Sequence, residues 1–434
     1  MKVAVLGAGI TGVVVTRELC SQGHDVTCFE AADRPGGLCS SEVIDGFVCD
    51  RAGGHIIFSK DPAVLAYMLD ALEPVGHHTS RRQTFIFEEG GYVTYPYENG
   101  LCDLPLEARF ACLNDYVEAA FARRNGAPRP DDFKSWCLWR FGEAICKRFM
   151  FPYNEKIWNV PLEELGVEWV AGRVPDAPLA DVLRSSLGLR TEGYKHQSVF
   201  HYPLEGGFES LVRGVVSHIP RGVIRCGTPV NQVEKTNGGW LVDGQPFDRV
   251  ISTIPLQVLG SILKDVPETM RRAFERLDYV SLVTVFLALD RPEVPQHSWI
   301  YFPSPAAGPQ NRITYLSNYS PRNAPPGKTS IMAEVTYHRE LPASLDQIKE
   351  DVVAGLAASG LVERKHVMWA RTFQSRYAYI LYRKDLERNV AAVRDHCRSI
   401  DLDIVGRFGN YNYFNSDMCI RAAFDLSRKY RDQV

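Results

Sequence analysis

A glycine-rich turn near the start of the chain sets the strongest constraint on its fold. The apolar run Val3–Leu6 leads into Gly7-Ala8-Gly9-Ile10-Thr11-Gly12, and a helical pattern then runs to a second strand-like segment, Val26–Phe29. In such a turn the first glycine permits the tight bend, the second lets the backbone approach a pyrophosphate, and the third lets the helix pack against the strand. The spacing predicts a βαβ unit whose helix N-terminus binds the phosphates of a dinucleotide.

The segment after this unit narrows the choice of dinucleotide. Glu30 ends the second strand-like run, where a carboxylate accepts hydrogen bonds from an adenosine ribose. Arg34-Pro35-Gly36-Gly37 follows shortly after it. An acid followed by this arginine and glycine pair resembles the extended FAD fingerprint of amine oxidases, protoporphyrinogen oxidases and sugar mutases. FAD is therefore the expected cofactor, and a plain turn before a third strand is the alternative interpretation of the glycine pair.

Composition and charge argue against several classes of protein. The chain has 434 residues, enough for two or three domains with large cores. A net charge of −3 with no long basic run argues against nucleic acid as a partner. The 11 cysteines form no CxxC pair and no cluster with histidine at metal-ligand spacing, so we expect reduced thiols, a cytoplasmic location and no metal site. No run of about 18 apolar residues occurs, and no membrane partner is expected.

Hydrophobic periodicity predicts an α/β protein with a Rossmann-like FAD-binding domain, an inserted helical domain and an antiparallel β-sheet substrate domain. Apolar residues recur at helical spacing over Leu106–Arg124 and Asp132–Met150, and we expect a further helix over Glu163–Val174. Prolines bracket the aromatic stretch Pro152–Pro161, which we expect to be a ligand-lining loop rather than a helix. Alternating patterns predict strands at Val280–Leu289, Ser298–Phe302, Arg312–Ser317 and Thr329–Thr336.

The order of these segments predicts where the domains begin and end. We expect the FAD-binding domain in three parts, at residues 1–95, 191–265 and 386–434. The helical inserted domain is expected at residues 96–190 and the antiparallel substrate sheet at residues 266–385. A final helical pattern, Asp417–Lys429, would close the nucleotide-binding domain.

Nearly the whole chain resembles the UDP-galactopyranose mutases, particularly those of eukaryotic type. Two motifs, Gly7–Gly12 and Gly53–Ser59, are shared with the wider superfamily of FAD-dependent amine oxidases and protoporphyrinogen oxidases. Later motifs are more specific, and the most specific runs from Trp299 to Pro321. The other matching segments are Tyr92–Asn99, Arg148–Pro161, Trp169–Val174, Ile331–Val335, Leu386–Arg388 and Gly406–Asp417.

Members of that family convert a nucleotide-linked sugar between its pyranose and furanose forms. The resemblance implies FAD that is active when reduced: its N5 attacks the anomeric carbon and displaces the nucleoside diphosphate, the sugar ring opens and recloses, and the reaction is redox-neutral. It also implies NAD(P)H or another reductant as a partner. Whether the protein forms a homo-oligomer is left open. Two alternatives remain. One is an FAD-dependent oxidoreductase of amine oxidase or protoporphyrinogen oxidase type, acting on a C–N or C–C bond. The other is a flavin-binding protein without catalysis.

The resemblance also implies roles for individual residues. Arg173 and Arg312 match the family's diphosphate-binding arginines, and a planar, permanently charged guanidinium suits that task. Together with His55, which matches the histidine beside the flavin, they are the expected catalytic residues. The residues expected to bind substrate are Tyr97, Glu98, Tyr153, Asn154, Trp158, Arg173, Trp299, Tyr301, Arg312, Tyr319, Tyr379, Arg407 and Tyr413. Those expected to bind FAD are Gly7, Gly9, Thr11, Gly12, Glu30, Arg34, Gly36, Gly37, Leu38, Gly54, His55, Val230, Gly406, Asn415, Asp417 and Met418.

The chain departs from the family's pattern at two positions. Glu98 stands where the family has a glutamine that reads uracil. An ionised carboxylate accepts hydrogen bonds but donates none, so it can bind the N3–H of uracil but not a carbonyl, and it suits the two N–H donors of guanine better. Asn412 replaces an arginine in the shortened segment Gly406–Asp417, so the sugar pocket is expected to differ. Both UDP and GDP remain open on this evidence.

Overall fold

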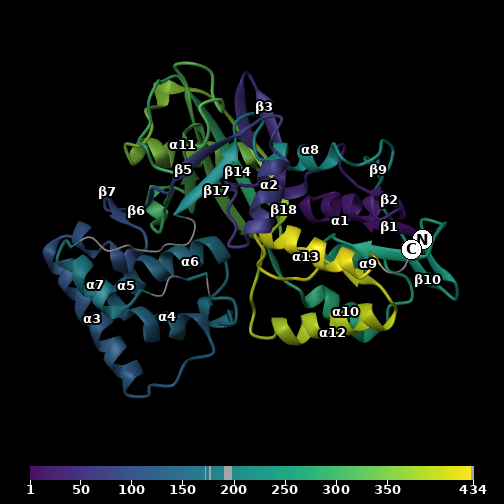
Figure 1. Ribbon diagram of the computed structural model, residues 1–434. Coiled ribbons are helices and arrows are strands. Elements are labelled where there is room, and N and C mark those ends of the chain that lie inside the picture. Colours follow the sequence, from purple (N-terminus) through teal and green to yellow (C-terminus); the bar gives the residue numbers. More distant parts are fainter. Residues whose placement is uncertain (172, 175–176, 190–197, 432–434) are drawn as a thin grey trace.

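Figure 1 shows the computed structural model, which describes residues 1–171, 173–174, 177–189 and 198–431. The chain forms three parts: a sheet with helices at the right of the view, a cluster of helices at the lower left, and a second sheet at the top. The domain boundary expected between residues 190 and 191 lies outside the described residues. Among the described residues, no helix has the length and apolar character needed to cross a membrane.

A five-stranded parallel sheet carries the glycine-rich turn. Its strand order is β19-β13-β1-β2-β9, with β1 in the centre. Helix α1 (Ile10–Ser21) begins within the glycine-rich motif and leads to β2, so the expected βαβ unit is present. The strands are β1 Lys2–Leu6, β2 Asp25–Phe29, β9 Ile224–Arg225, β13 Arg249–Ser252 and β19 Asp403–Ile404.

Alternate residues of β1 face two different hydrophobic cores. Val3 and Val5 belong to a core that they share with α1 and α13 (Ser416–Arg428). Ala4 and Leu6 belong to a second core, formed with a three-stranded sheet and helices α9, α10 and α12. Both faces are covered, as a parallel sheet requires. The elements of the second core are β10 Val233–Thr236, β11 Gly239–Val242, β12 Gln245–Phe247, α9 Leu256–Ile262, α10 Glu268–Arg276 and α12 Leu386–Ser399.

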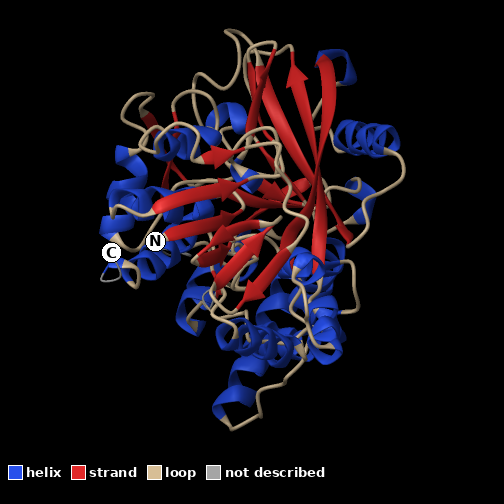
Figure 2. Ribbon diagram, turned by 90° about the vertical axis from the view of Figure 1, so that its right-hand side faces the viewer, coloured by secondary structure: helices blue, strands red, loops and turns tan. Residues whose placement is uncertain are grey.

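The second sheet has seven strands, in the order β18-β14-β17-β16-β15-β6-β7, and its long strands cross the view of Figure 2. Neighbours are antiparallel except β15 and β6, which pair in parallel, so the sheet is mixed rather than wholly antiparallel as expected. Helix α11 (Leu345–Ala358) shares a core with this sheet. Its strands are β6 Thr84–Glu88, β7 Gly91–Thr94, β14 Tyr279–Leu289, β15 Trp299–Tyr301, β16 Arg312–Thr314, β17 Thr329–His338 and β18 Val367–Ile380.

The hairpin β6–β7 joins this second sheet, although it falls in the sequence before the helical part. The hairpin therefore pairs with the strands of the second sheet, although it lies within the segment 1–95 that was expected to belong to the FAD-binding domain. The remaining elements outside the helical part are α2 Pro62–Asp70, α8 Glu209–Val216, and two two-stranded sheets, β3 Ser41–Ile44 with β4 Phe47–Asp50 and β5 His77–Arg81 with β8 Val199–Pro203.

The helical part contains the elements between β7 and β8. Helix α3 spans Leu106–Arg124, as the periodicity predicts. The next pattern, Asp132–Met150, is divided at Gly142, which has a φ of 78° and lies against the backbone of Asp115, where an added Cβ would come within 2.6 Å of a carbonyl carbon. The pieces are α4 Phe133–Phe141, α5 Glu143–Ile145 and a π-helical turn over Cys146–Met150, and α7 Leu179–Ser186 follows later.

The stretch Pro152–Pro161 is mainly helical, which corrects the expectation of a loop. Helix α6 runs over Phe151–Trp158 and continues from the preceding π-helical turn. Pro152 lies at the junction of the π-helical turn and α6, where the regular hydrogen-bond pattern of an α-helix is interrupted, so its missing N–H costs less than it would inside a regular helix. Asn159 ends the helix in the left-handed conformation, with a φ of 56°. Pro152 therefore lies inside the helical segment without preventing it, and Pro161 lies beyond its end.

The helix expected over Glu163–Val174 is also absent from the described part of that range, and Gly172 lies outside it. A short 3-10 turn covers Leu162–Glu164, and the chain then leaves helical geometry. Leu165 forms a β-bridge with Arg383, and the N–H of Gly166 donates to the carbonyl of Tyr382 at 2.7 Å. These long-range backbone hydrogen bonds replace the local ones that a helix would need.

Candidate functional site

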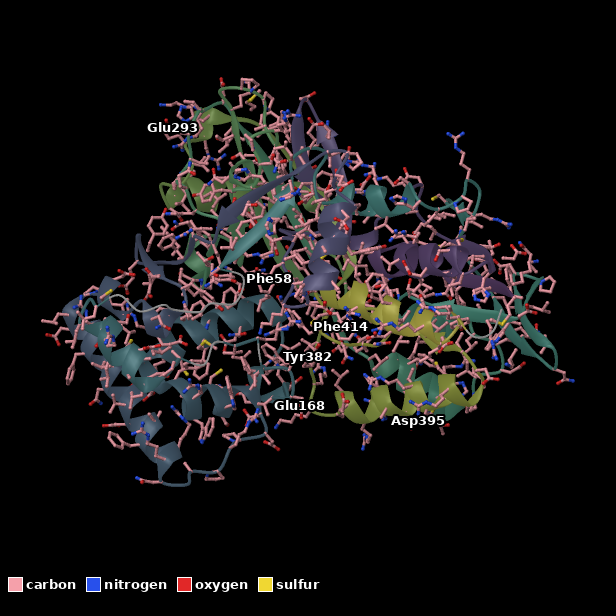
Figure 3. All side chains as sticks on the ribbon, viewed as in Figure 1. Phe58, Glu168, Glu293, Tyr382, Asp395 and Phe414 are labelled. Carbon is pink, nitrogen blue, oxygen red and sulfur yellow. The ribbon has the colours of Figure 1, made fainter. Side chains whose placement is uncertain are left out.

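A cavity of about 880 Å³ runs between the three parts of the molecule. Phe58 and Phe414, which both line it, lie near the centre of Figure 3, where those parts meet. The residues expected from the sequence that line the cavity are Gly7, Gly9, Thr11, Glu30, Arg34, Gly36, Gly37, Leu38, Gly54, His55, Tyr97, Glu98, Tyr153, Asn154, Trp158, Arg173, Val230, Trp299, Tyr301, Arg312, Tyr379, Arg407, Tyr413 and Asn415. Those that do not line it are Gly12, Tyr319, Gly406, Asp417 and Met418.

The three glycines of the first turn differ in their conformation and in the atoms around them. Gly7 has a φ of 92°, a conformation that strongly favours glycine. A Cβ added to Gly12 would lie 1.9 Å from the carbonyl oxygen of Gly7, so this glycine lets the helix pack on the strand. A Cβ added to Gly9 would meet no atom within 4 Å. Gly9 lines the cavity, and the space in front of its backbone is open. A pyrophosphate needs such open space to approach the backbone closely.

The second glycine pair packs directly on the first turn. Gly36 donates its N–H to the carbonyl of Ala8 at 2.9 Å and forms a bridge with Gly9. A Cβ added to Gly37 would lie 3.3 Å from the Cα of Gly9. Arg34, just before this pair, donates from Nη2 to the carbonyl of Ser41 at 3.2 Å. This hydrogen bond ties the segment before the glycine pair to the segment after it. Gly7 and Gly9 of the first turn and the pair Gly36-Gly37 therefore lie together at the cavity wall.

Glu30 braces the same turn. Its Oε2 accepts from the N–H of Ala8 at 2.7 Å, and its Oε1 accepts from the N–H of Ala32 at 2.9 Å. A carboxylate has lone pairs left after two such bonds. Because Glu30 also lines the cavity, it can both fix the turn and accept from the hydroxyls of a ribose. The open backbone at Gly9 and this acid fit the phosphates and the ribose of FAD.

A buried carboxylate organises the wall of the cavity that the second sheet supplies. Glu334 on β17 is 1% exposed and lies opposite Arg312 in the strand register. Its Oε1 accepts from Nε and Nη2 of Arg312 at 2.9 and 2.6 Å and from the N–H of Gly54 at 3.1 Å. Its Oε2 accepts from the hydroxyl of Tyr379 at 3.1 Å. Burial alone would lower the pKa of Arg312, but Glu334 and nearby tyrosines outweigh it and keep that pKa raised.

Glu334 was not among the expected site residues. The signal available in the sequence is a single acid inside the apolar run Ile331–Val335. Period-two alternation does not say which side chain stands opposite on the next strand, and only the register shows that this one is Arg312.

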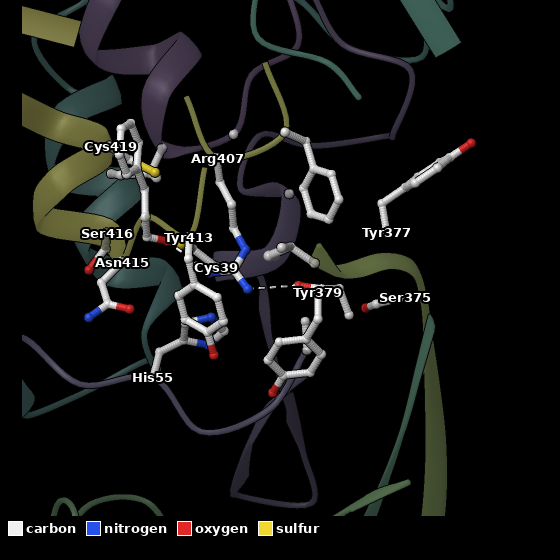
Figure 4. Close-up of a pocket in the computed structure, with 18 of the residues that line it drawn as sticks. Cys39, His55, Ser375, Tyr377, Tyr379, Arg407, Tyr413, Asn415, Ser416 and Cys419 are labelled. Carbon is white, nitrogen blue, oxygen red and sulfur yellow. Dashed lines mark hydrogen bonds between the residues drawn. The ribbon is translucent and has the colours of Figure 1, made fainter. Parts of the chain in front are cut away.

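Two further arginines, Arg173 and Arg407, make cation–π contacts with the ring of Tyr413. The guanidinium carbon of Arg173 lies 4.3 Å from the ring centre and that of Arg407 lies 4.6 Å from it. Arg173 donates to Asn415 Oδ1 at 3.1 Å, and Arg407 donates to the carbonyls of Phe414 and Ala378 at 2.8 and 3.2 Å. Figure 4 shows Arg407 between the rings of Tyr413 and Tyr379. Together with Arg312, whose charge is balanced by Glu334, these side chains place three guanidinium groups at the cavity.

The expected residues that do not line the cavity pack behind its wall. Tyr319 is 1% exposed and packs against Phe200 and Tyr202. Gly406 has a φ of 98°, and a Cβ there would lie 2.6 Å from the hydroxyl oxygen of Thr11. The sulfur of Met418 accepts from Arg173 at 3.7 Å. Burial raises the pKa of the Asp417 carboxyl, which lies beside Ser59.

His55 is held as a neutral imidazole. Burial lowers its pKa from 6.5 to about 4, with the opposing charges of Glu334 and Arg312 as smaller effects. Its Nδ1 lies 3.0 Å from the carbonyl of Gly53 and can only donate to it, which assigns the lone pair to Nε2. His55 can therefore accept a hydrogen bond from a bound ligand over the physiological pH range.

This shift predicts a pH effect on stability. Between pH 6.5 and about 4, the unfolded chain protonates His55 while the folded chain does not, so the free energy of unfolding falls as the pH is lowered. Denaturant titrations of the FAD-free protein across that range should show a smaller fall for His55→Gln than for the wild type. Equal pH dependence in the two proteins would contradict the neutral state of the partly buried His55.

Comparisons with known proteins show the family and the fold of the chain. A family model described as flavin containing amine oxidoreductase matches residues 10–362, and the chain belongs to that family. The fold is similar to that of a reduced UDP-galactopyranose mutase, with a TM-score of 0.91 and 25% identity over 100% of this chain and 96% of that one. A putative protoporphyrinogen oxidase from Exiguobacterium sp. 255-15 has a TM-score of 0.76 and 18% identity, covering 100% and 99% of the two chains.

A curated relative matches a short segment only. The 4,4'-diapophytoene desaturase of Staphylococcus aureus (strain COL) is 46% identical over 61 residues, which are 14% of this chain and 12% of the desaturase. The family and the fold together identify the chain as an enzyme of the FAD-dependent amine oxidase superfamily with a fold like that of the mutase. Its cofactor is FAD, as the fingerprint predicts.

Proposed function

We propose that this enzyme interconverts the pyranose and furanose forms of a nucleotide-linked sugar, without net oxidation or reduction. The observation that carries the proposal is the set of three arginines, Arg173, Arg312 and Arg407, in the cavity that begins at the FAD fingerprint. Guanidinium groups bind phosphate oxygens through paired hydrogen bonds. Such a cationic site suits a diphosphate that must leave the sugar and be retained, whereas it would repel the protonated amine that an amine oxidase takes.

The fold comparison supports the same choice. The likeness to the reduced UDP-galactopyranose mutase extends over the full chain with a TM-score of 0.91. Oxidases share the fold at lower similarity; a putrescine oxidase bound to putrescine, for example, has a TM-score of 0.69 and 17% identity. An oxidoreductase acting on a C–N or C–C bond is therefore the second candidate, and the experiment below separates the two.

In this proposal the protein binds and orients the substrate. Arg312 and Arg173 bind the diphosphate, and Glu334 keeps the Arg312 guanidinium in one orientation through two hydrogen bonds. Tyr379 is oriented by the same carboxylate, and neutral His55 accepts a hydrogen bond beside the flavin. Reduced FAD supplies the nucleophilic nitrogen when it is bound. NAD(P)H or another reductant would provide the electrons once, because the reaction itself consumes none.

The test is an assay with UDP- and GDP-linked hexoses under anaerobic conditions, with and without dithionite. The proposal predicts that the pyranose and furanose forms of at least one of them interconvert only when the flavin is reduced. A reaction that requires oxygen or another electron acceptor and yields an oxidised product would overturn it in favour of the oxidoreductase. Failure of the reduced enzyme to isomerise any member of the panel would also overturn it.

A further inference from the structure

The side of the cavity that carries Arg173 and Arg407 is built on a turn with uncommon backbone geometry. Tyr413, whose ring contacts both arginines, follows Tyr411 by two residues (Figure 4). Tyr411 has a φ of 56°, in the left-handed region that a bulky side chain rarely adopts. Such a conformation persists only where surrounding contacts hold it, and residues of this kind cluster at functional sites. The contacts that hold Tyr411 therefore bear on the shape of the site.

Tyr411 belongs to the second core behind this wall, whereas Tyr413 lines the cavity. The side chain of Tyr411 is 1% exposed, and its ring meets that of Phe408 edge-on at 5.9 Å. Between the two tyrosines, the N–H of Asn412 donates to the carbonyl of Arg407 at 3.0 Å and closes the turn. One residue thus separates a ring fixed in the core from a ring at the cavity, so the place of Tyr413 depends on how Tyr411 is held.

The hydroxyl of Tyr411 fixes the ring from within the core. It donates to the carbonyl of Asp278 and accepts from Gln257 Nε2 at 2.7 Å. Gln257 belongs to α9, and Asp278 lies directly before β14. One buried hydroxyl therefore joins three segments that lie far apart in the chain.

The acceptor of this hydrogen bond is itself firmly held. Asp278 is 4% exposed, and its carboxylate accepts from Arg339 Nε and Arg383 Nε, both at 2.7 Å. Arg383 also pairs with Glu164 of the helical part. These charged hydrogen bonds tie Asp278 to the second sheet and to the helical part, so the hydroxyl of Tyr411 has a rigid partner.

From these contacts we infer that Tyr411 is a positioning residue, which holds Tyr413, and through it Arg173 and Arg407, in the arrangement that binds the diphosphate of the substrate. The inference rests on the proposed function, which places a diphosphate at these arginines. Tyr411 does not line the cavity and acts only through its neighbours. Arg173 contacts the ring of Tyr413 and donates to its carbonyl, so a shift of this turn moves both partners of that guanidinium.

Tyr411→Phe tests the inference, because it removes only the hydroxyl group. Gln257 keeps a hydrogen bond to a backbone carbonyl, and the carbonyl of Asp278 keeps the N–H of Leu381 at 3.0 Å, so the variant should fold. Without its anchor the turn can relax from the left-handed conformation and displace Tyr413. Calorimetry on the FAD-loaded, reduced variant should show about tenfold weaker binding of GDP or UDP, whichever the wild type binds. The ratio of FAD to protein should equal that of the wild type.

Tyr430→Phe is the matched control. Tyr430 is 3% exposed, donates its hydroxyl to Asp403 Oδ2 at 2.6 Å and does not line the cavity. Both variants lose one buried hydrogen bond, so both should unfold at a slightly lower temperature than the wild type. Only Tyr411→Phe should lose affinity for the nucleotide.

Outcomes for Tyr411 and for the reaction are separate. Wild-type affinity in Tyr411→Phe, or equal weakening in both variants, would refute the positioning role, while isomerisation by the wild type would still support the proposed function. Weaker binding in Tyr411→Phe alone, without isomerisation by the wild type, would support the role of Tyr411 and refute the mutase. A wild type that binds neither GDP nor UDP would overturn both.

Discussion

Replacing Arg312 by lysine should lower the affinity of the reduced enzyme for a nucleoside diphosphate about 100-fold while leaving FAD bound. Lysine keeps the positive charge next to Glu334 but loses the planar fork that binds phosphate oxygens in pairs. Losing paired, charge-assisted hydrogen bonds costs about 3 kcal/mol, which corresponds to this change in affinity. Calorimetric titration with GDP and UDP measures the effect directly.

Lysine is a better choice than alanine because Glu334 is only 1% exposed. Removing the arginine entirely would leave that carboxylate buried without its cation, at a cost to stability of about 3–5 kcal/mol. A matched control is Arg376→Lys on β18, which lines the same cavity but donates to Tyr279 and pairs with Glu340. Its affinity for nucleotides should equal that of the wild type. Unchanged binding in Arg312→Lys would refute the assignment of Arg312 to the diphosphate.

Gly9→Ala should weaken FAD binding without destabilising the fold, whereas Gly12→Ala should destabilise the fold itself. At Gly9 the added methyl group meets no protein atom within 4 Å, so the FAD-free protein should unfold at the same temperature as the wild type or slightly higher. The methyl group would occupy the space that the cofactor's phosphates need. Such overpacking costs about 1–3 kcal/mol, so the affinity for FAD should fall roughly 10- to 100-fold.

Gly12→Ala places its Cβ 1.9 Å from the carbonyl oxygen of Gly7. Backbone must move to relieve this contact, and we expect the fold itself to lose about 3 kcal/mol. Two measurements on each variant distinguish the sites: the ratio of FAD to protein after purification, and the thermal midpoint of the FAD-free form by circular dichroism. If Gly9→Ala retains its flavin, or if Gly12→Ala is as stable as the wild type, the arrangement of the turn is wrong.

Local patterns predicted those parts of the molecule whose chemistry depends on neighbours in the sequence. The spacing Gly7–Gly12, the acid Glu30 and the pair Gly36-Gly37 predicted the turn and FAD, because a phosphate-binding backbone is built within a few dozen residues. Helix α3 matched its periodicity over Leu106–Arg124 for the same reason. The residues named from the family's motifs gather around one cavity, although Tyr319 and four others lie behind its wall.

Contacts between segments that lie far apart in the chain could not be predicted from the sequence. Arg312 was expected at the site, but its partner Glu334 is known only from the register of β16 with β17. The segment after Leu162 was expected to be helical, and its backbone instead bonds to Tyr382 and Arg383, more than two hundred residues away. The stretch Pro152–Pro161 was misinterpreted because the sequence does not show that Pro152 falls at the junction of a π-helical turn and α6, a place that tolerates proline.

The central claim is that the flavin takes part in the reaction without net electron transfer. The most direct measurement follows the visible absorbance of FAD in the anaerobically reduced enzyme while a nucleotide-linked hexose is converted. Our account predicts many product molecules per flavin, with ring size as the only change, while the flavin remains reduced throughout and no acceptor is added. The result that would contradict it is product limited to one equivalent per flavin, accompanied by oxidation or reduction of the sugar.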